Sequence, residues 1–178
     1  INVSGTTKID KDSSVFYINK GKVNYTGKDI VLPDSTTGIT LVGTDPGVAA
    51  DFNGKSITVG ENATGIYITG QAAVGSNTIQ NLQKINVGKL GNGIYINNNN
   101  PFSTNTTLEI SGEEGIGIYS TKDGNLTYGG KIDSTVTKAK GIVHTGAGDT
   151  INNGVIQLTG DSSIGAYAKG GNLLENTN

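Results

Sequence analysis

Four residue types are absent from this chain of 178 residues: cysteine, methionine, tryptophan and arginine. Without cysteine the chain has no disulfides and no thiolate metal ligands. All 13 basic residues are therefore lysines, and the formal net charge is −2. The chain thus has neither a basic patch nor the arginines that make bidentate phosphate contacts, so the sequence predicts no nucleic-acid partner.

Long apolar runs are missing as well. No segment approaches the about 18 consecutive apolar residues that span a membrane, and no charged-then-apolar signal segment opens the chain. Because the sequence contains no methionine, we do not expect Ile1 to be a translation start. We therefore interpret residues 1–178 as a single repeat segment of a longer protein.

Glycine, asparagine and threonine are abundant instead. The 28 glycines are too many for long helices, because each interior glycine costs about 1 kcal/mol relative to alanine. Short β-branched runs alternate with turn residues at close intervals, which predicts many short strands.

One four-residue phrase recurs along the chain: a glycine, an aliphatic residue, usually a tyrosine, and a small or apolar residue. The glycines of the clear copies are separated by 28, 24, 24 and 24 residues. Two weaker copies at Val15–Ile18 and Gly38–Leu41 bring the count to about seven repeats, and a fixed period of this size is typical of repeat architectures. The clear copies are Gly65–Ile68, Gly93–Ile96, Gly117–Ser120, Gly141–His144 and Gly165–Ala168.

Each repeat contains two further short strands. One lies eight or nine residues before the phrase and alternates apolar, polar and apolar residues. Corners such as Gly60–Asn62 follow it, and we expect their glycines to supply positive φ. A less regular strand is expected near residues 77–79, 106–107, 125–127 and 150–151. The strands before the phrase are Ile30–Leu32, Ile57–Val59, Ile85–Val87, Leu108–Ile110, Ile132–Ser134 and Ile156–Leu158.

Three strands per period, with no two-residue hairpin loops between them, predict a coil rather than a series of hairpins. The fold class expected is all-β: a right-handed parallel β-helix with three sides and about seven coils of about 24 residues, in which each strand pairs with its counterpart one turn later. The blades of a β-propeller need about 40 residues, so that fold does not fit.

The alternation of residues along these strands also predicts the core. Two columns of apolar side chains should stack inside the coil, because the opposite register would place all of them in water. The first column is Phe16, Ile39, Ile66, Ile94, Ile118, Ile142 and Ala166, and the second is Ile30, Ile57, Ile85, Leu108, Ile132 and Ile156.

Candidate ligand-binding residues lie in the tyrosine column and in the loops at 70–75 and 97–102, which interrupt the regular coil. The tyrosines should point outward, where phenol rings can stack on sugars or anchor a protein partner. The alternative is that they only stabilise the sheet by pairing along its face. The residues concerned are Tyr17, Tyr67, Tyr95, Tyr119 and Tyr167 in the column, and Asn98 and Phe102 in the second loop.

The sequence offers no catalytic or metal-binding constellation. His144 is the only histidine, and we interpret it as a structural residue at the coil surface or half-buried. Glu109 and Asp133 share one column on adjacent coils, which is the arrangement that polysaccharide hydrolysis needs, but they also fit a solvated polar face. The aspartate and glycine pairs near 123–124 and 148–149 do not repeat at nine residues as in a calcium-binding roll. We expect no catalytic residue, metal or cofactor.

Together, the Gly-Ile-Tyr copies and the stretches 152–156 and 160–168 resemble the passenger region of large autotransporter adhesins of the fusobacterial type. The resemblance implies a β-helical stalk on the bacterial cell surface, secreted by type V secretion and held in the outer membrane by a C-terminal barrel that this segment lacks. It implies attachment to a host glycan, to a glycoprotein or immune receptor, or to partner bacteria. It transfers no individual functional residue.

Three functions remain open on this basis. The leading hypothesis is a non-enzymatic adhesin segment. The second is a carbohydrate-active β-helix enzyme, either hydrolase or lyase, and the third is a structural spacer that holds a distal part of the protein away from the membrane.

Overall fold

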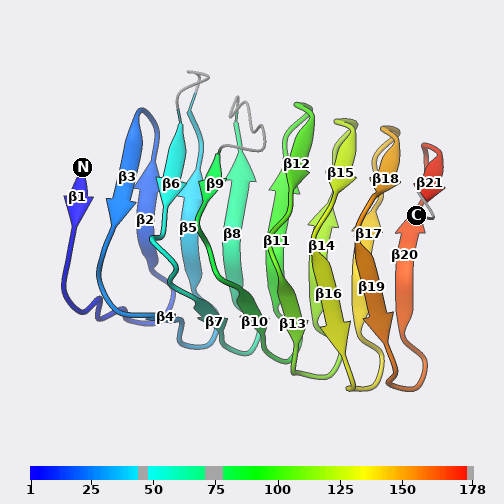
Figure 1. The fold of residues 1–178 in the computed structure, drawn as a ribbon, viewed down its shortest axis with the longest axis horizontal. Coiled ribbons are helices and arrows are strands. Elements are labelled where there is room, and N and C mark those ends of the chain that lie inside the picture. The colour runs from blue at the N-terminus through cyan, green and yellow to red at the C-terminus, as the bar shows by residue number, and fades with distance from the viewer. Residues whose placement is uncertain (44–47, 71–77, 176–178) are drawn as a thin grey trace.

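The computed structural model describes residues 1–43, 48–70 and 78–175. In these residues the chain forms an all-β solenoid of about seven turns, a right-handed parallel β-helix, as predicted. Figure 1 shows the turns following one another in chain order from the N-terminus to the C-terminus. No helix of the described part is long and apolar enough to cross a membrane.

One side of the solenoid is a seven-stranded parallel sheet, here called the tyrosine sheet, which runs through every turn. It contains the recurring phrase, and each strand between the first and the last pairs with the strands one turn before and one turn after it. Its strands are β2 (Ser14–Ile18), β5 (Thr37–Leu41), β8 (Thr64–Thr69), β11 (Asn92–Asn97), β14 (Ile116–Ser120), β17 (Lys140–His144) and β20 (Ile164–Ala168).

The second side is a six-stranded parallel sheet, here called the second sheet, and it is also continuous. Its strands are those predicted to precede the phrase, with small differences at their ends. They are β4 (Ile30–Val31), β7 (Ile57–Val59), β10 (Ile85–Val87), β13 (Leu108–Ile110), β16 (Lys131–Ser134) and β19 (Val155–Leu158).

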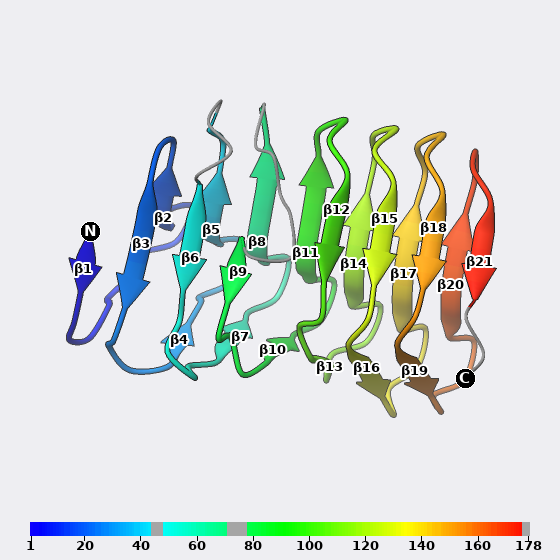
Figure 2. The same cartoon turned by 45° about the horizontal axis from the view of Figure 1, so that its top comes forward.

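The third side, here called the split face, is divided into two four-stranded parallel sheets (Figure 2). Pairing runs from β1 to β9 and begins again at β12, and no pairing joins β9 to β12. The first half contains β1 (Asn2–Val3), β3 (Lys22–Tyr25), β6 (Ala49–Asp51) and β9 (Ile79–Gln80), and the second contains β12 (Phe102–Thr104), β15 (Leu126–Tyr128), β18 (Thr150–Asn152) and β21 (Leu173–Glu175).

The strand register confirms both predicted core columns. Ile66 pairs with Ile39 and Ile94, and Ile85 pairs with Ile57 and Leu108, in unbroken succession along the two continuous sheets. The isoleucines in the middle turns are fully buried, as the alternation predicts. Phe16, Ile156 and Ala166 at the ends of the columns are partly buried and pack against the same core.

The glycine of the phrase is required by close packing between turns. A Cβ atom at Gly117 would lie 2.7 Å from the carbonyl oxygen of Gly141 in the next turn, and one at Gly65 would lie 2.6 Å from the oxygen of Gly93. At Gly165, in the last turn described, the nearest atom to such a Cβ is a side-chain carbon of Ile156 at 3.8 Å. The phrase therefore begins with glycine because consecutive turns touch at this point of the backbone.

The expectation that the corner glycines supply positive φ is wrong. The residue with left-handed backbone stands two positions after the glycine, for example Asn62 after Gly60, with φ 54°, and Leu90 after Gly88, also with φ 54°. These glycines are needed for space instead, because a Cβ at Gly60 would lie 2.7 Å from the backbone of Pro33. The residues with positive φ at these corners are Ser35, Asn62, Leu90, Glu114, Lys138 and Ser162.

Candidate functional site

The outer surface of the tyrosine sheet carries a stack of three aromatic rings. Tyr67, Tyr95 and Tyr119 are paired across adjacent strands, and their ring centroids are 5.2 Å apart in each pair, with interplanar angles of 25° and 12°. Asn97 Nδ2 donates a hydrogen bond to the Tyr67 hydroxyl over 3.2 Å. The three side chains are half-buried and, as predicted, lie on the face opposite the buried isoleucines.

Stacking decides which part of each ring a ligand can contact. The two faces of Tyr95 are covered by its neighbours, so the stack presents ring edges and hydroxyl groups rather than a flat surface for a sugar ring. Tyr17 and Tyr167 stand apart from the stack, because Thr40 and Val143 occupy the intervening positions of the column. They are 68% and 44% exposed.

The other two predicted ligand-binding residues lie in the interior. Asn98 is 4% exposed and Phe102 is 2% exposed. Phe102 was expected in a turn, but it begins β12 and pairs with Leu126, a buried residue of β15. Neither side chain offers an accessible surface to a ligand, so neither fits the binding role predicted for it.

Most of the predicted loop at 70–75 lies outside the described part of the chain, which omits residues 71–77. Gly70 is described and has positive φ. A Cβ on this residue would lie 2.6 Å from the carbonyl oxygen of Val42 in the preceding turn.

His144 is a structural residue, but it is fully buried rather than half-buried or at the surface. Its Nε2 lies 2.9 Å from the Lys122 carbonyl oxygen, and its Nδ1 lies 2.9 Å from Thr150 Oγ1. Because a carbonyl only accepts, Nε2 carries the proton and Nδ1 accepts from the threonine hydroxyl. The ring therefore joins β17 both to β18 of the split face and to the connection between β14 and β15 in the preceding turn.

Glu109 and Asp133 are paired in register on the second sheet, as predicted, and border a shallow cleft of about 220 Å³. Each carboxylate has a lysine partner: Lys84 Nζ lies 2.7 Å from Glu109, and Lys131 Nζ lies 2.7 Å from Asp133. Both pairs are exposed, where ion pairs contribute little stability. In the described ranges, no three histidine, aspartate or glutamate side chains gather as ligands of a metal ion would.

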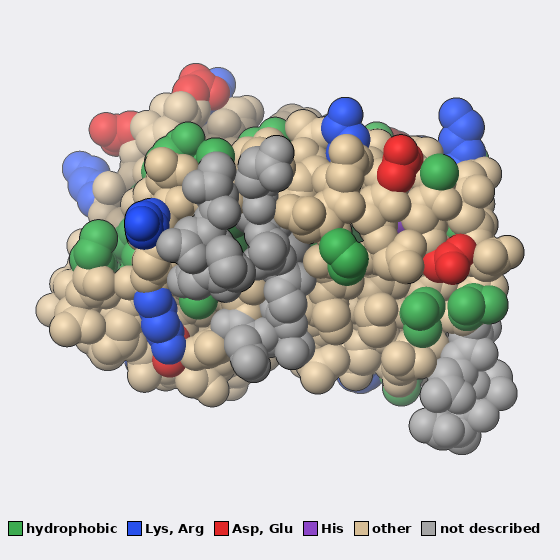
Figure 3. All heavy atoms as spheres, turned by 90° about the horizontal axis from the view of Figure 1, so that it is seen from above, with side chains coloured by type: hydrophobic (Ala, Val, Ile, Leu, Met, Phe, Trp, Pro, Cys, Tyr) green, Lys and Arg blue, Asp and Glu red, His purple; other side chains and the backbone are tan. Residues whose placement is uncertain are grey.

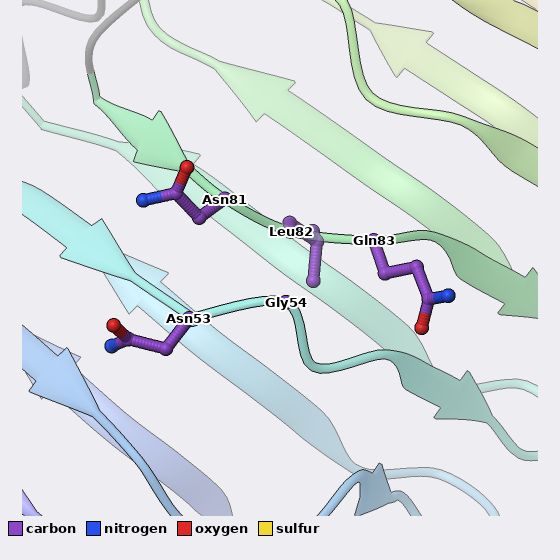
Figure 4. A pocket seen from close by; sticks show the side chains of 5 residues that line it. All are labelled: Asn53, Gly54, Asn81, Leu82 and Gln83. Carbon is purple, nitrogen blue, oxygen red and sulfur yellow. The ribbon is translucent and has the colours of Figure 1, made fainter.

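A larger groove lies at the corner between the split face and the second sheet (Figure 4). Its volume is about 580 Å³, and it is lined by Asn53, Gly54, Asn81, Leu82 and Gln83. Leu82 lies between Asn81 and Gln83 and points toward Gly54. None of the five lining residues carries a charge.

A tight turn forms one wall of this groove. Asn53 and Gly54 have consecutive positive φ values of 48° and 78°, and the amide of Lys55 donates to the Phe52 carbonyl over 3.0 Å. This combination is typical of a type I′ turn, which favours Asn-Gly. A Cβ at Gly54 would meet no atom within 4 Å, so there is free space beside the turn.

Asp51 holds the asparagines of the groove in place. Its Oδ1 accepts hydrogen bonds from Asn81 Nδ2 at 3.0 Å and from the Asn53 amide at 3.2 Å, and its Oδ2 lies 3.3 Å from Lys22 Nζ. The hydrogen bond from Asn81, reinforced by the Asn53 amide and Lys22, lowers the pKa of Asp51, although partial burial opposes the shift. The carboxylate thus stays ionised as a fixed acceptor behind the groove.

Sequence reasoning missed this groove. The dipeptide Asn53-Gly54 signals a turn, but no local signal in the sequence indicates which corner of the coil is hollow. Comparison of the chain with protein-family models, with curated proteins and with solved structures finds no match in any of the three.

Proposed function

We propose that this chain is a non-enzymatic segment of a bacterial cell-surface adhesin of the autotransporter type, which attaches the cell to host surfaces or to other bacteria. The observation that carries the proposal is the aromatic stack of Tyr67, Tyr95 and Tyr119 on the outside of an otherwise regular solenoid. A straight rod with aromatic side chains on one outer face presents an extended surface to a partner.

The corner next to the tyrosine sheet has a largely uncharged surface, which favours a protein or glycan partner over a highly charged one. Seen over the corners that join the tyrosine sheet to the split face, most of the described surface is backbone and uncharged polar side chains, and the charged side chains are scattered (Figure 3). Tyrosine edges and hydroxyls combine apolar contact with hydrogen bonding, which suits a partially polar ligand.

The test is direct binding of the 178-residue chain to host cells and to partner bacteria. In the test variant, Tyr67, Tyr95 and Tyr119 are changed together to alanine. In the matched control, three outward residues of the second sheet, Thr58, Asn86 and Gln157, are changed to alanine. Loss of binding in the tyrosine variant alone, with the circular dichroism of both variants unchanged, supports the proposal. Equal binding by all three proteins removes the tyrosine stack from the adhesive surface.

The same binding experiment and an activity assay also test the two alternative functions. If the chain binds no cell type, the spacer function replaces adhesion. The cleft between Glu109 and Asp133 is the place where an enzymatic activity would have to lie. Release of reducing sugars from a polysaccharide panel that stops in Glu109→Gln and Asp133→Asn would establish the carbohydrate-active enzyme and overturn the proposal.

A further inference from the structure

The groove at Asn53 lies next to the interruption of the split face. Pairing ends at β9, and a smaller cleft of about 160 Å³ follows, lined by Ile79, Asn81, Leu82, Asn105 and Thr106. Asn81 and Leu82 line both hollows, so the two are adjacent parts of one depression. It extends from the turn of Asn53 to the turn of Asn105, two strand intervals or about 10 Å along the rod.

The amides of the groove have defined orientations. Asn53 Nδ2 donates to Asn24 Oδ1 at 2.6 Å and to the Tyr25 carbonyl at 3.1 Å, so its Oδ1 remains as the acceptor. Asn81 Nδ2 donates to Asp51, so Asn81 likewise presents its Oδ1. Because these contacts fix the amides before any ligand arrives, binding would cost little side-chain entropy.

Gln83 has the opposite polarity. Its Oε1 accepts a hydrogen bond from Ser56 Oγ over 3.1 Å, which leaves the Nε2 amide group as a donor at the other end of the groove. Leu82 lies between these polar ends and supplies an apolar patch. The groove therefore combines two acceptors, one donor and one apolar side chain.

We propose that this groove binds a neutral oligosaccharide. Sugar hydroxyls both donate and accept, so neighbouring hydroxyls match the mixed set formed by Asn53, Asn81 and Gln83, while the C–H face of a sugar ring packs on Leu82. An anionic ligand would need a cationic side chain, and the five lining residues include none. The site is separate from the tyrosine stack and does not depend on the proposed adhesive function.

A peptide strand fits the groove less well than a sugar. Adding a strand requires unpaired backbone groups at the edge. Here the Gly54 amide donates to the Asn81 carbonyl at 2.7 Å, and the Gln83 amide donates to the Lys55 carbonyl at 2.9 Å. The backbone between the turns of Gly54 and Gln83 is therefore already bonded, and in this part of the depression the side chains carry the recognition.

The test uses the 178-residue chain and a set of soluble tetrasaccharides followed by ligand-observed NMR and calorimetry. The neutral probes are cellotetraose, maltotetraose, chitotetraose and lacto-N-tetraose, and the charged probes are sialylated lacto-N-tetraose and a heparin-derived tetrasaccharide. We expect saturable binding of at least one neutral probe and no preference for the charged ones. Stronger binding of a charged probe, no binding of any neutral probe, or displacement by a peptide library would overturn the proposal.

The decisive variant is Gly54→Asn. Asparagine tolerates left-handed backbone better than most other residues, and the open space beside Gly54 admits its side chain, which then fills the groove at the cost of some strain in the turn. Gly21→Asn is a matched control, because Gly21 has φ 82° and open space of the same kind at a different corner. Gly54→Asn should weaken the neutral probe at least about tenfold, and Gly21→Asn should leave it unchanged.

A second set of variants removes single polar groups. Asn53 and Asn81 have left-handed backbone, with φ 48° and 50°, so each is changed to glycine rather than alanine to avoid strain. Gln83→Ala removes the donor. Each change should weaken the probe by roughly threefold to tenfold. Unaltered affinity in Gly54→Asn together with all three removals would place the sugar elsewhere on the chain. Intact cell binding by Gly54→Asn would leave the adhesive function standing even then.

Discussion

The tyrosine sheet and the split face are built by the same seven turns, yet one is continuous and the other is interrupted. The difference follows from where the turns vary in length. The connection from the second sheet to the tyrosine sheet has four or five residues in every turn, for example 60–63 and 111–115. The connection from the tyrosine sheet to the split face ranges from three residues (19–21) to nine (70–78).

This distribution explains why the recurring phrase stays in register even where the period changes from 28 to 24 residues. Most of the extra residues lie in the connection before the split face, whereas the connection from the split face to the second sheet varies less, from two residues (129–130) to five (52–56). The split face, which follows the most variable connection, is the side whose pairing is interrupted. Pairing stops between β9 and β12, after the longest connection. The groove with its amide side chains is located at that interruption.

The two halves of the split face are also stabilised differently. In the first half, the outward column Asn2, Asn24, Asp51 and Gln80 is amide-rich and is joined by side chain to side chain contacts such as that from Lys22 to Gln80 at 2.8 Å. In the second half, side chains at the corner bond the backbone of the next turn, as when Asp123 Oδ1 accepts from the Ala147 amide at 2.8 Å. A constant period of 24 residues allows that bond to recur from turn to turn.

The largest expected effect concerns the continuity of the tyrosine sheet. Gly117→Ala should lower the free energy of unfolding by about 2–4 kcal/mol, because the added methyl group would meet the Gly141 carbonyl at 2.7 Å and two strands would have to separate. Gly165→Ala is the matched control and should change stability by less than about 0.5 kcal/mol, since no backbone atom lies near its Cβ. Urea unfolding measures both. Equal losses would mean that the contact between turns does not govern the choice of glycine.

The next prediction concerns His144, which links the tyrosine sheet to the split face. His144→Ala should cost about 2–3 kcal/mol, because it leaves a cavity and removes a partner from both the Lys122 carbonyl and the Thr150 hydroxyl. The adjacent Val143 is on the outer face of the same strand and serves as control. Val143→Ala should cost less than half as much in the same unfolding experiment. An effect of His144→Ala no larger than that of Val143→Ala would contradict the role of His144 as a fixed link to β18.

An intermediate effect is expected from Tyr128, which is fully buried in the second half of the split face and donates to the Thr106 carbonyl over 2.9 Å. Burial raises the pKa of its phenol, so the folded state keeps the proton at pH values where the unfolded chain begins to lose it. The stability that this group contributes is therefore fully present below about pH 10 and is lost as the pH rises above that value.

Tyr128→Phe tests this pH dependence. At neutral pH the variant should lose about 1 kcal/mol with the hydrogen bond. Above about pH 10, the decline in its unfolding free energy should be shallower than that of the unmodified chain, by up to about 1.4 kcal/mol per pH unit. Unfolding titrations between pH 8 and about pH 11 measure both slopes. Parallel slopes would show that other groups alone account for the alkaline loss.

The sequence predicted the continuous sides much better than the split face, and for a physical reason. A strict period and a two-residue alternation identify the buried columns directly, because only one register buries Ile66 and Ile94. The same alternation places His144 inward, two positions after Ile142, so its burial was available from the sequence. The prediction of a half-buried or surface histidine follows from the usual exposure of single polar residues. It ignores the inward direction that the position of His144 in its strand indicates.

Phe102 shows a second kind of failure. It stands 24 residues before Leu126, and the period alone would have placed it on an inward strand. The run of asparagines and the proline before it outweighed that signal. The groove differs from both cases, because its walls come from residues 53–54 and 81–83 of two different turns and leave no local pattern in the sequence.

The smallest effect is expected at the end of the split face, where Asp149 Oδ1 accepts from both the amide and the Nδ2 of Asn172 at 2.9 and 3.0 Å. Asp149→Ala should cost about 1 kcal/mol, because these bonds are partly exposed to water. The loss should be confined to β21, whose amides should exchange faster with deuterium while those of β14 and β17 keep their protection. Since each turn of a solenoid contacts only its neighbours, a loss that spread to β14 would mean that the last turns of the solenoid unfold as one cooperative unit rather than turn by turn.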